Sequence, residues 1–153
     1  MNRLNQIENG IRSMEGGEFQ KLCDLYLHQK YGWELFTPGS MDGTNKTTAG
    51  TPDTYAYMYD SEKYILAMYG TRENSVKKLE SDIKDAKEKS KLSEEKIEKI
   101  VCCYVGSNIS VAEHDRLIGL AAPYTLIICN STSIAMDLMG EYQTLAFEFF
   151  DLP

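Results

Sequence analysis

The sequence predicts an α/β domain in which helices flank a mixed central β-sheet. Two strand-like runs, Thr54–Tyr59 and Lys63–Tyr69, are separated by only three residues, which is typical of an antiparallel hairpin. After residue 100 apolar strands alternate with helices, as in a parallel sheet that is covered on both faces. The 153 residues suffice to bury one hydrophobic core, so we expect a single domain over residues 1–153.

The first half of the chain predicts one long helix followed by the hairpin. Apolar residues recur at helical spacing from Phe19 to Tyr26, which indicates an amphipathic helix over Gly17–Lys30, and Gly32 is a stop signal. Trp33–Thr37 is expected to form a short strand. The hairpin runs are rich in tyrosine, a residue that suits a half-buried sheet surface.

The second half predicts helices and strands in alternation. After a helix over Ser75–Lys89, the polar segment Lys87–Lys99 is expected either to extend that helix or to form a mobile surface segment. Ser110 is the expected N-cap of the next helix, and Asn130 or Ser131 is the expected N-cap of the one after it. The remaining elements are expected as strands over 100–105 and 124–129 and as helices over 111–120, 131–138 and 141–149.

Composition excludes several classes of protein. The net charge of −7 argues against a dedicated basic nucleic-acid-binding module, although a metal-dependent nuclease needs clustered carboxylates and is not excluded. No apolar run approaches the roughly 18 residues of a membrane helix, and the chain has no signal-peptide, P-loop or dinucleotide-binding pattern. The four cysteines lack metal-type spacing, so we expect buried reduced thiols in a cytoplasmic protein, with Cys102 and Cys103 on opposite faces of a strand.

One long loop and two acidic residues are the candidates for a metal site. The loop Pro38–Pro52 is polar and rich in glycine, and long loops in compact domains are often functional. Asp53 follows this loop directly, at the point where the chain enters a strand, so its carboxylate can be held rigidly at a sheet edge. Glu18 lies at the start of the first amphipathic helix, after two glycines.

These residues resemble the motif of the PD-(D/E)XK nuclease superfamily, which places a helix glutamate, a Pro-Asp aspartate and an acid-X-lysine triplet around one metal site. Glu18 matches the helix acid and Asp53 matches the Pro-Asp acid, and the resemblance covers nearly the whole chain. It implies a restriction-endonuclease-like fold and a phosphodiester hydrolase that uses Mg²⁺ or Mn²⁺ and cuts DNA rather than RNA. Asp53 and Glu18 would be catalytic metal ligands.

The basic residues near these acids have expected roles of their own. The resemblance implies that Lys77 is a catalytic cation, which stabilises the charge that develops on the phosphate. Lys78, on the same helix, is expected to contact the phosphate backbone of the substrate. Asp42 and Lys46 lie in the long loop and are expected to face the substrate, although Asp42-Gly43 is also a favoured turn pair.

The second half of the family motif is missing from the sequence. The two phases of the hairpin's second strand are Ala67/Tyr69 and Met68/Gly70, and neither holds an acid or a lysine. Three explanations remain open. The site has migrated, with a carboxylate from Glu73 or Asp42 and a cation from Arg72, Lys77 or Lys46; or a glutamate has been substituted to silence a toxic nuclease; or the domain is an inactive nuclease.

Three segments resemble a particular branch of this superfamily: the loop Gly39–Asp53 and the helical segments Lys77–Ile83 and Ala135–Leu138. That branch provides effector domains at the N-termini of bacterial antiphage defence proteins, in which a nucleotide-switching ATPase follows. The resemblance implies further domains in a longer chain. Because an acidic domain binds DNA poorly at physiological salt, we expect activity to need an oligomer of several copies.

Two other functions remain open. The missing triplet and the acidic charge favour a catalytically inactive nuclease-fold module for protein–protein association or nucleic-acid binding, in which Tyr55 or Tyr57 could line a nucleic-acid groove. The third reading is a small-molecule-binding α/β domain, which predicts a pocket at the C-terminal ends of the strands Ile100–Val105 and Tyr124–Cys129.

Overall fold

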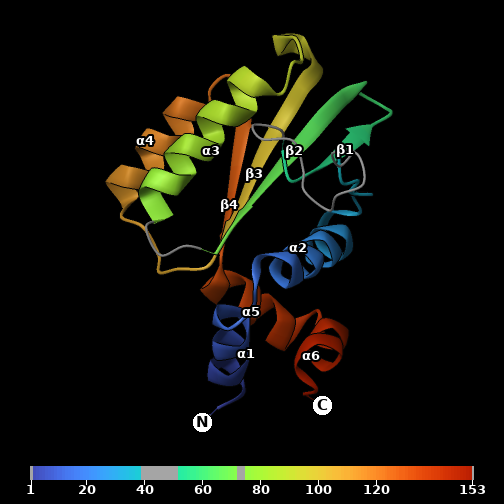
Figure 1. Cartoon of the computed structure of the whole chain (residues 1–153), viewed down its shortest axis with the longest axis vertical. Coiled ribbons are helices and arrows are strands. Elements are labelled where there is room, and N and C mark those ends of the chain that lie inside the picture. The colour runs from blue at the N-terminus through green and yellow to red at the C-terminus, as the bar shows by residue number, and fades with distance from the viewer. Residues whose placement is uncertain (1, 39–51, 72–74, 153) are drawn as a thin grey trace.

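The computed structural model describes residues 2–38, 52–71 and 75–152, and these form an α/β domain around one mixed β-sheet (Figure 1). The four strands of the described sheet lie in the order β1-β2-β3-β4. The first two strands form the expected antiparallel hairpin, and β3 and β4 continue the sheet parallel to β2. The strands are β1 Thr54–Met58, β2 Lys63–Gly70, β3 Ile97–Tyr104 and β4 Thr125–Asn130.

Six α-helices of the described chain cover the sheet in two groups (Figure 1). From Ile65 of β2 and Ile100 of β3 onward, one group packs with the odd-numbered residues into one hydrophobic core, and the other group packs with the even-numbered residues into a second core. The first group is α1 Arg3–Arg12, α2 Gly16–Tyr31, α5 Ser131–Gly140 and α6 Gln143–Phe150, and the second is α3 Ser75–Lys89 and α4 Val111–Ala121.

Successive side chains along each strand point alternately into one core and into the other. Met68 and Cys102 belong to the core under α3 and α4, whereas Tyr69 and Cys103 belong to the core under α2 and α5. The prediction that Cys102 and Cys103 occupy opposite faces is therefore confirmed. All four cysteines are free and buried, as expected.

Most of the expected elements are present, with shifted ends. Ser110 and Asn130 cap α4 and α5 through capping boxes, as two of the N-cap predictions stated. The predicted strand Trp33–Thr37 is wrong: only Phe36 pairs with β1, through a single bridge to Tyr55. The helix α1 was not expected.

The polar segment after α3 is neither a helix extension nor wholly irregular. A short 3₁₀ helix over Glu94–Lys96 follows α3, and β3 begins at Ile97, earlier than its apolar run suggested. Ile97 is buried and pairs with Tyr64 of β2, so tertiary pairing extends the strand into a charged stretch. Within the described residues, no helix is long and apolar enough to cross a membrane.

Candidate active site

Asp53 is fixed at the edge of the sheet by the backbone of the neighbouring strand. It precedes β1, and its Oδ2 accepts a hydrogen bond of 2.7 Å from the backbone N–H of Tyr69 on β2. Thr54 points toward α2, so strand alternation directs Asp53 to the opposite face, toward α3. Burial raises the pKa of the Asp53 carboxyl, and the Tyr69 N–H and the charge of Lys78 offset part of this rise.

A lysine and an aspartate of α3 face Asp53 from across this edge. Lys78 and Asp82 are one helical turn apart and form an ion pair with an Nζ–Oδ1 distance of 2.7 Å. Asp82 is 4% exposed. Burial raises the pKa of the Asp82 carboxyl, its contact with Lys78 lowers it, and the charge of Asp53 raises it again. Asp53, Asp82 and Lys78 therefore form one electrostatic cluster.

Lys78 also covers the strand position where the nuclease motif expects a lysine. A Cβ atom built on Gly70 would lie 3.4 Å from both Cγ and Cε of Lys78. Met68, in the same phase of β2 as Gly70, is buried in the same core as Leu79 and Ile83 of α3. The face of β2 that holds Met68 and Gly70 is thus covered by a helix that carries both an acid and a lysine.

A second carboxylate lies on the other face of the hairpin. Asp24 of α2 accepts hydrogen bonds from the Thr54 hydroxyl at 2.9 Å and from the Tyr69 phenol at 2.5 Å. Burial raises the pKa of the Asp24 carboxyl, the bonds from Tyr69 and Thr54 lower it, and the charge of Asp53 raises it. Tyr69 therefore links the two aspartates, because its backbone holds Asp53 and its side chain holds Asp24.

The sequence-predicted residues are brought together only in part. Glu18 is exposed in the first turn of α2, about 9 Å along the helix from Asp24, and no hydrogen bond or ion pair among the described residues joins it to Asp53. Lys77 is exposed beside Lys78. The roles predicted for Glu18 and Lys77 stay predictions. Four named candidates lie outside the described residues: Asp42, Lys46, Arg72 and Glu73.

Sequence reasoning missed Asp82 and Asp24 as parts of this site. A signal for Asp82 existed, because it lies between Leu79 and Ile83 on the side of α3 that was expected to be buried. A charged residue at such a position needs a partner, and Lys78 is one turn away. No comparable signal marks Asp24, which is one of several polar residues in α2.

The donors at this edge fit a divalent cation that is bound by few protein ligands. The described residues contain no group of three or more His, Cys, Asp or Glu side chains placed to hold a metal. Asp53 and Asp82 offer two carboxylates, and burial disfavours their charged forms in the absence of a cation. Mg²⁺ commonly binds through one or two carboxylates, waters and the phosphate groups of a substrate. Two carboxylates beside a lysine match that pattern.

A cavity of about 430 Å³ lies at the C-terminal ends of β3 and β4, where a small-molecule site was expected. The helix after β3 covers one face of the sheet and the helix after β4 covers the other, an arrangement that opens a crevice between the two strands. Asn130, in the cavity wall, donates a hydrogen bond to Asn108 and accepts one from the backbone of Ser133. Its polar groups are thus already engaged, and ligand binding there stays a prediction.

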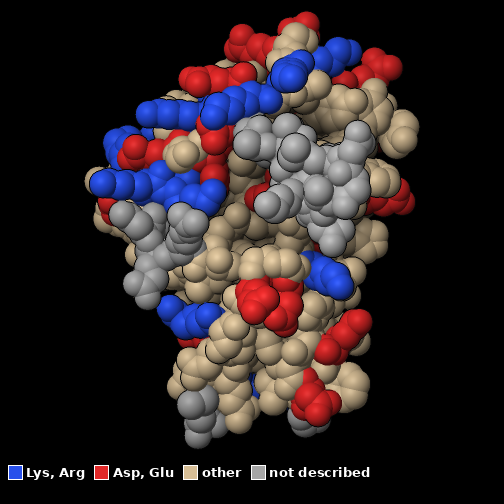
Figure 2. All heavy atoms as spheres, in the orientation of Figure 1, with Lys and Arg blue, Asp and Glu red and all other residues tan. Residues whose placement is uncertain are grey.

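The lysine-rich surface of α3 is partly neutralised by acids. Figure 2 shows basic side chains in rows over α3, with acidic side chains between them. Glu80 pairs with Arg116 at 2.6 Å and Asp85 pairs with Lys89 at 3.4 Å.

Comparison of the chain with protein-family models, with curated proteins and with solved structures gave no match.

Proposed function

We propose that this domain is a metal-dependent nuclease of the restriction-endonuclease-like class in which α3 supplies the acid and the lysine that β2 lacks. The proposal is carried by the charge interaction of Asp53 with both members of the Lys78–Asp82 ion pair, whose lysine lies over Gly70. This is a migrated site, one of the three explanations for the missing triplet, with different donors from those the sequence suggested.

Each residue has a distinct role in the proposed reaction. Asp53 and Asp82 would hold Mg²⁺ or Mn²⁺ together with the scissile phosphate. The ion, when bound, polarises the phosphate and lowers the pKa of the attacking water. Lys78 would donate hydrogen bonds to the phosphate oxygens on which negative charge develops. Asp24 would act through Tyr69, by fixing the strand whose backbone N–H orients Asp53.

The wider biological role rests on the resemblance of the sequence. We infer a DNA-cleaving effector of bacterial antiphage defence, which works beside further domains of a longer chain. The net charge of −7 supports a requirement for several clustered copies, because one acidic domain attracts DNA weakly at physiological salt.

The test is cleavage of supercoiled plasmid, single-stranded DNA and RNA with Mn²⁺ at high protein concentration. Asp53→Asn, Asp82→Asn and Lys78→Met should each lower the rate at least about 100-fold, as loss of electrostatic stabilisation does in other enzymes. Asp85→Asn is a matched control, because it removes an α3 carboxylate that pairs with Lys89 instead. Normal cleavage by Asp82→Asn would contradict the assignment of α3.

The second candidate is a catalytically inactive module of the same fold. Its support is the absence of a three-ligand metal group in the described part of the chain. It predicts that wild type and all variants are silent with every substrate. A metal titration separates the two candidates without an activity assay, as argued below.

A further inference from the structure

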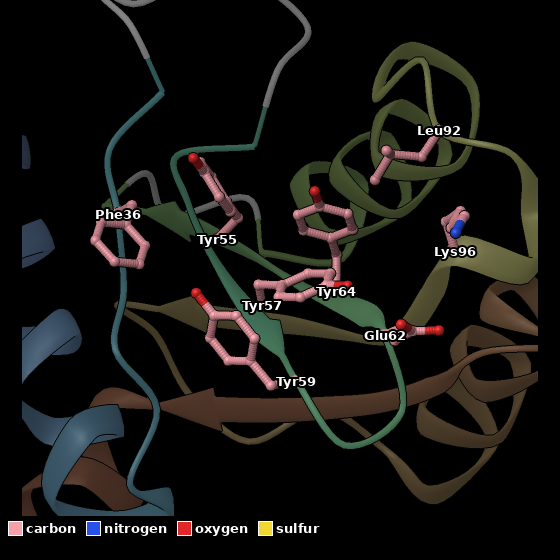
Figure 3. A pocket seen from close by; sticks show the side chains of 8 residues that line it. All are labelled: Phe36, Tyr55, Tyr57, Tyr59, Glu62, Tyr64, Leu92 and Lys96. Carbon is pink, nitrogen blue, oxygen red and sulfur yellow. The ribbon is translucent and has the colours of Figure 1, made fainter.

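Aromatic side chains continue from the candidate site along the edge strand. We call Phe36, Tyr55, Tyr57, Tyr59 and Tyr64 the aromatic strip. Tyr55 and Tyr57 of β1 alternate with buried Thr54 and Ala56, so these two tyrosines share the face to which Asp53, the residue before β1, is directed. Tyr59 follows in the turn after β1. Figure 3 shows these side chains, with Tyr57 lying between Tyr59 and Tyr64.

The rings of the aromatic strip form a connected surface. Tyr57 lies 4.9 Å from both Tyr59 and Tyr64 between ring centroids, and Tyr64 lies 5.9 Å from Tyr55. Tyr59 is 83% exposed and Phe36 is 52% exposed. Rings that served only the core would be buried, so this surface has aromatic area left for a partner.

Two cavities join the aromatic strip to the candidate site. The strip, Glu62, Leu92 and Lys96 line a cavity of about 530 Å³, with Glu62 and Lys96 on the side away from Phe36 (Figure 3). A second cavity of about 240 Å³ shares Tyr55, Tyr64 and Leu92 with the first and extends to Pro52, the neighbour of Asp53. The two cavities thus lead from the exposed rings as far as Pro52, next to Asp53, and Tyr55 in their wall lies two residues from Asp53 along the chain.

The chemistry of this path favours unpaired bases over other partners. Aromatic rings stack with any nucleobase, whereas bases within a duplex are already stacked on each other. One acid and one lysine line the larger cavity, so its charge gives little attraction of its own. The five residues of β1 span about 16 Å, and aromatic residues on sheets of other folds stack two or three bases over a comparable surface.

We propose that the aromatic strip binds single-stranded nucleic acid by base stacking and directs the strand toward Asp53, Asp82 and Lys78. This inference deepens the proposed nuclease function, because it names an unpaired strand as the substrate class. Binding by the strip does not itself need a metal, so it is measurable apart from cleavage.

The experiment is fluorescence anisotropy of labelled single strands of about 12 nucleotides, with the full chain in EDTA at low salt. Tyr57→Ala/Tyr59→Ala should weaken binding at least about five-fold, whereas Tyr57→Phe/Tyr59→Phe should stay within about two-fold because phenylalanine keeps the stacking face. Phe147→Ala is the matched control, since it removes a ring that is 60% exposed on α6. A duplex of equal length should bind more weakly than the single strand.

The outcomes distinguish this inference from the nuclease proposal. Asp115→Asn, on the exposed surface of α4, should bind single strands like wild type in EDTA, since it leaves the strip and the candidate site intact. If wild type binds but never cleaves, the strip stands and the nuclease assignment fails. The inference is overturned if wild type does not bind single strands, if the alanine variant binds or cleaves like wild type, or if that variant changes only self-association.

Discussion

At the scale of single residues, the candidate site rests on one buried aspartate, Asp82, and two partly buried ones, Asp53 and Asp24. Asp53, Asp82 and Asp24 each lose hydration on folding, and burial is the largest cause of the raised pKa of each. The hydrogen bonds and the lysine that face these carboxylates lower their pKa values but do not cancel the effect of burial. A bound cation would offset the remaining free-energy cost of ionising these carboxyls. Acids whose pKa values are raised by burial are therefore candidates for a functional site.

The raised pKa values predict how stability depends on pH. The folded state binds these protons more tightly than the unfolded chain, so the free energy of unfolding falls as pH rises from about 3.9, the ordinary aspartate value, through the raised folded values. In EDTA, Asp53→Asn and Asp82→Asn should remove part of this fall and should unfold at a higher temperature than wild type at neutral pH. Both amides keep an oxygen that accepts the bond from Tyr69 or Lys78.

Thermal unfolding of wild type and variants from pH 4 to 8 measures this effect. Asp115→Asn, on the exposed surface of α4, is the control for the loss of one surface carboxylate. If the unfolding temperatures of wild type and Asp53→Asn change in parallel with pH, the Asp53 carboxyl does not contribute to the pH dependence and the prediction is wrong.

At the scale of elements, the proposed function assigns to α3 the acid and the lysine that the nuclease motif places on a strand. The strand presents Met68 and Gly70, and the helix lays Lys78 and Asp82 against the same face. An i, i+4 pair on a helix keeps two side chains on one side, so it can replace two alternate residues of a strand. The small residue at position 70 leaves room for the Lys78 stem.

This assignment predicts that a strand acid can replace the helix acid. Met68→Glu alone should lower stability by at least about 1–3 kcal/mol in EDTA, because it buries a polar group where Met68 packs on Leu79 and Ile83. In an Asp82→Ala background, Met68→Glu should restore stabilisation by Mn²⁺ and part of the cleavage. Met68→Gln has the same size without the charge and should restore neither.

At the scale of the whole molecule, the packing of helices on the two faces of the sheet sets the positions of the aromatic strip and of the candidate site. The helices α3 and α4 pack on one face of the sheet, and the tyrosines of the edge strand β1 line an open cavity on that same face. The carboxylates lie where this cavity system approaches the C-terminal end of β2. The order of strands therefore places the candidate stacking surface beside the candidate site.

The whole domain should respond to a metal if the site is built as proposed. At a concentration of Mn²⁺ 100 times its dissociation constant, mass action stabilises the folded state by about 2.7 kcal/mol, roughly 5–10 °C in unfolding temperature for a domain of this size. The measurement is thermal unfolding across a Mn²⁺ titration, with Ca²⁺ and EDTA beside it. Asp53→Asn should lose most of the shift, and no shift in wild type would favour the inactive module.

The sequence by itself determined the fold class and most of the elements. Periodicity predicted the hairpin, the helices α2 and α3, and the later alternation of strands and helices, because burial on one face or both leaves a direct pattern in residue order. Capping residues determined where α4 and α5 begin. Asp53 was identified because a Pro-Asp pair at the start of a strand is a local feature.

Only the tertiary structure decided which residues join Asp53. The pairing of Asp82 with Lys78, the approach of Lys78 to Gly70 and the link from Tyr69 to Asp24 depend on how α2 and α3 pack on β2. Residues distant in sequence leave no periodic signal when they meet, so periodicity and spacing could not choose among the acids. The same limit explains why β3 begins at Ile97, since pairing with Tyr64 outweighs the polar composition of the segment.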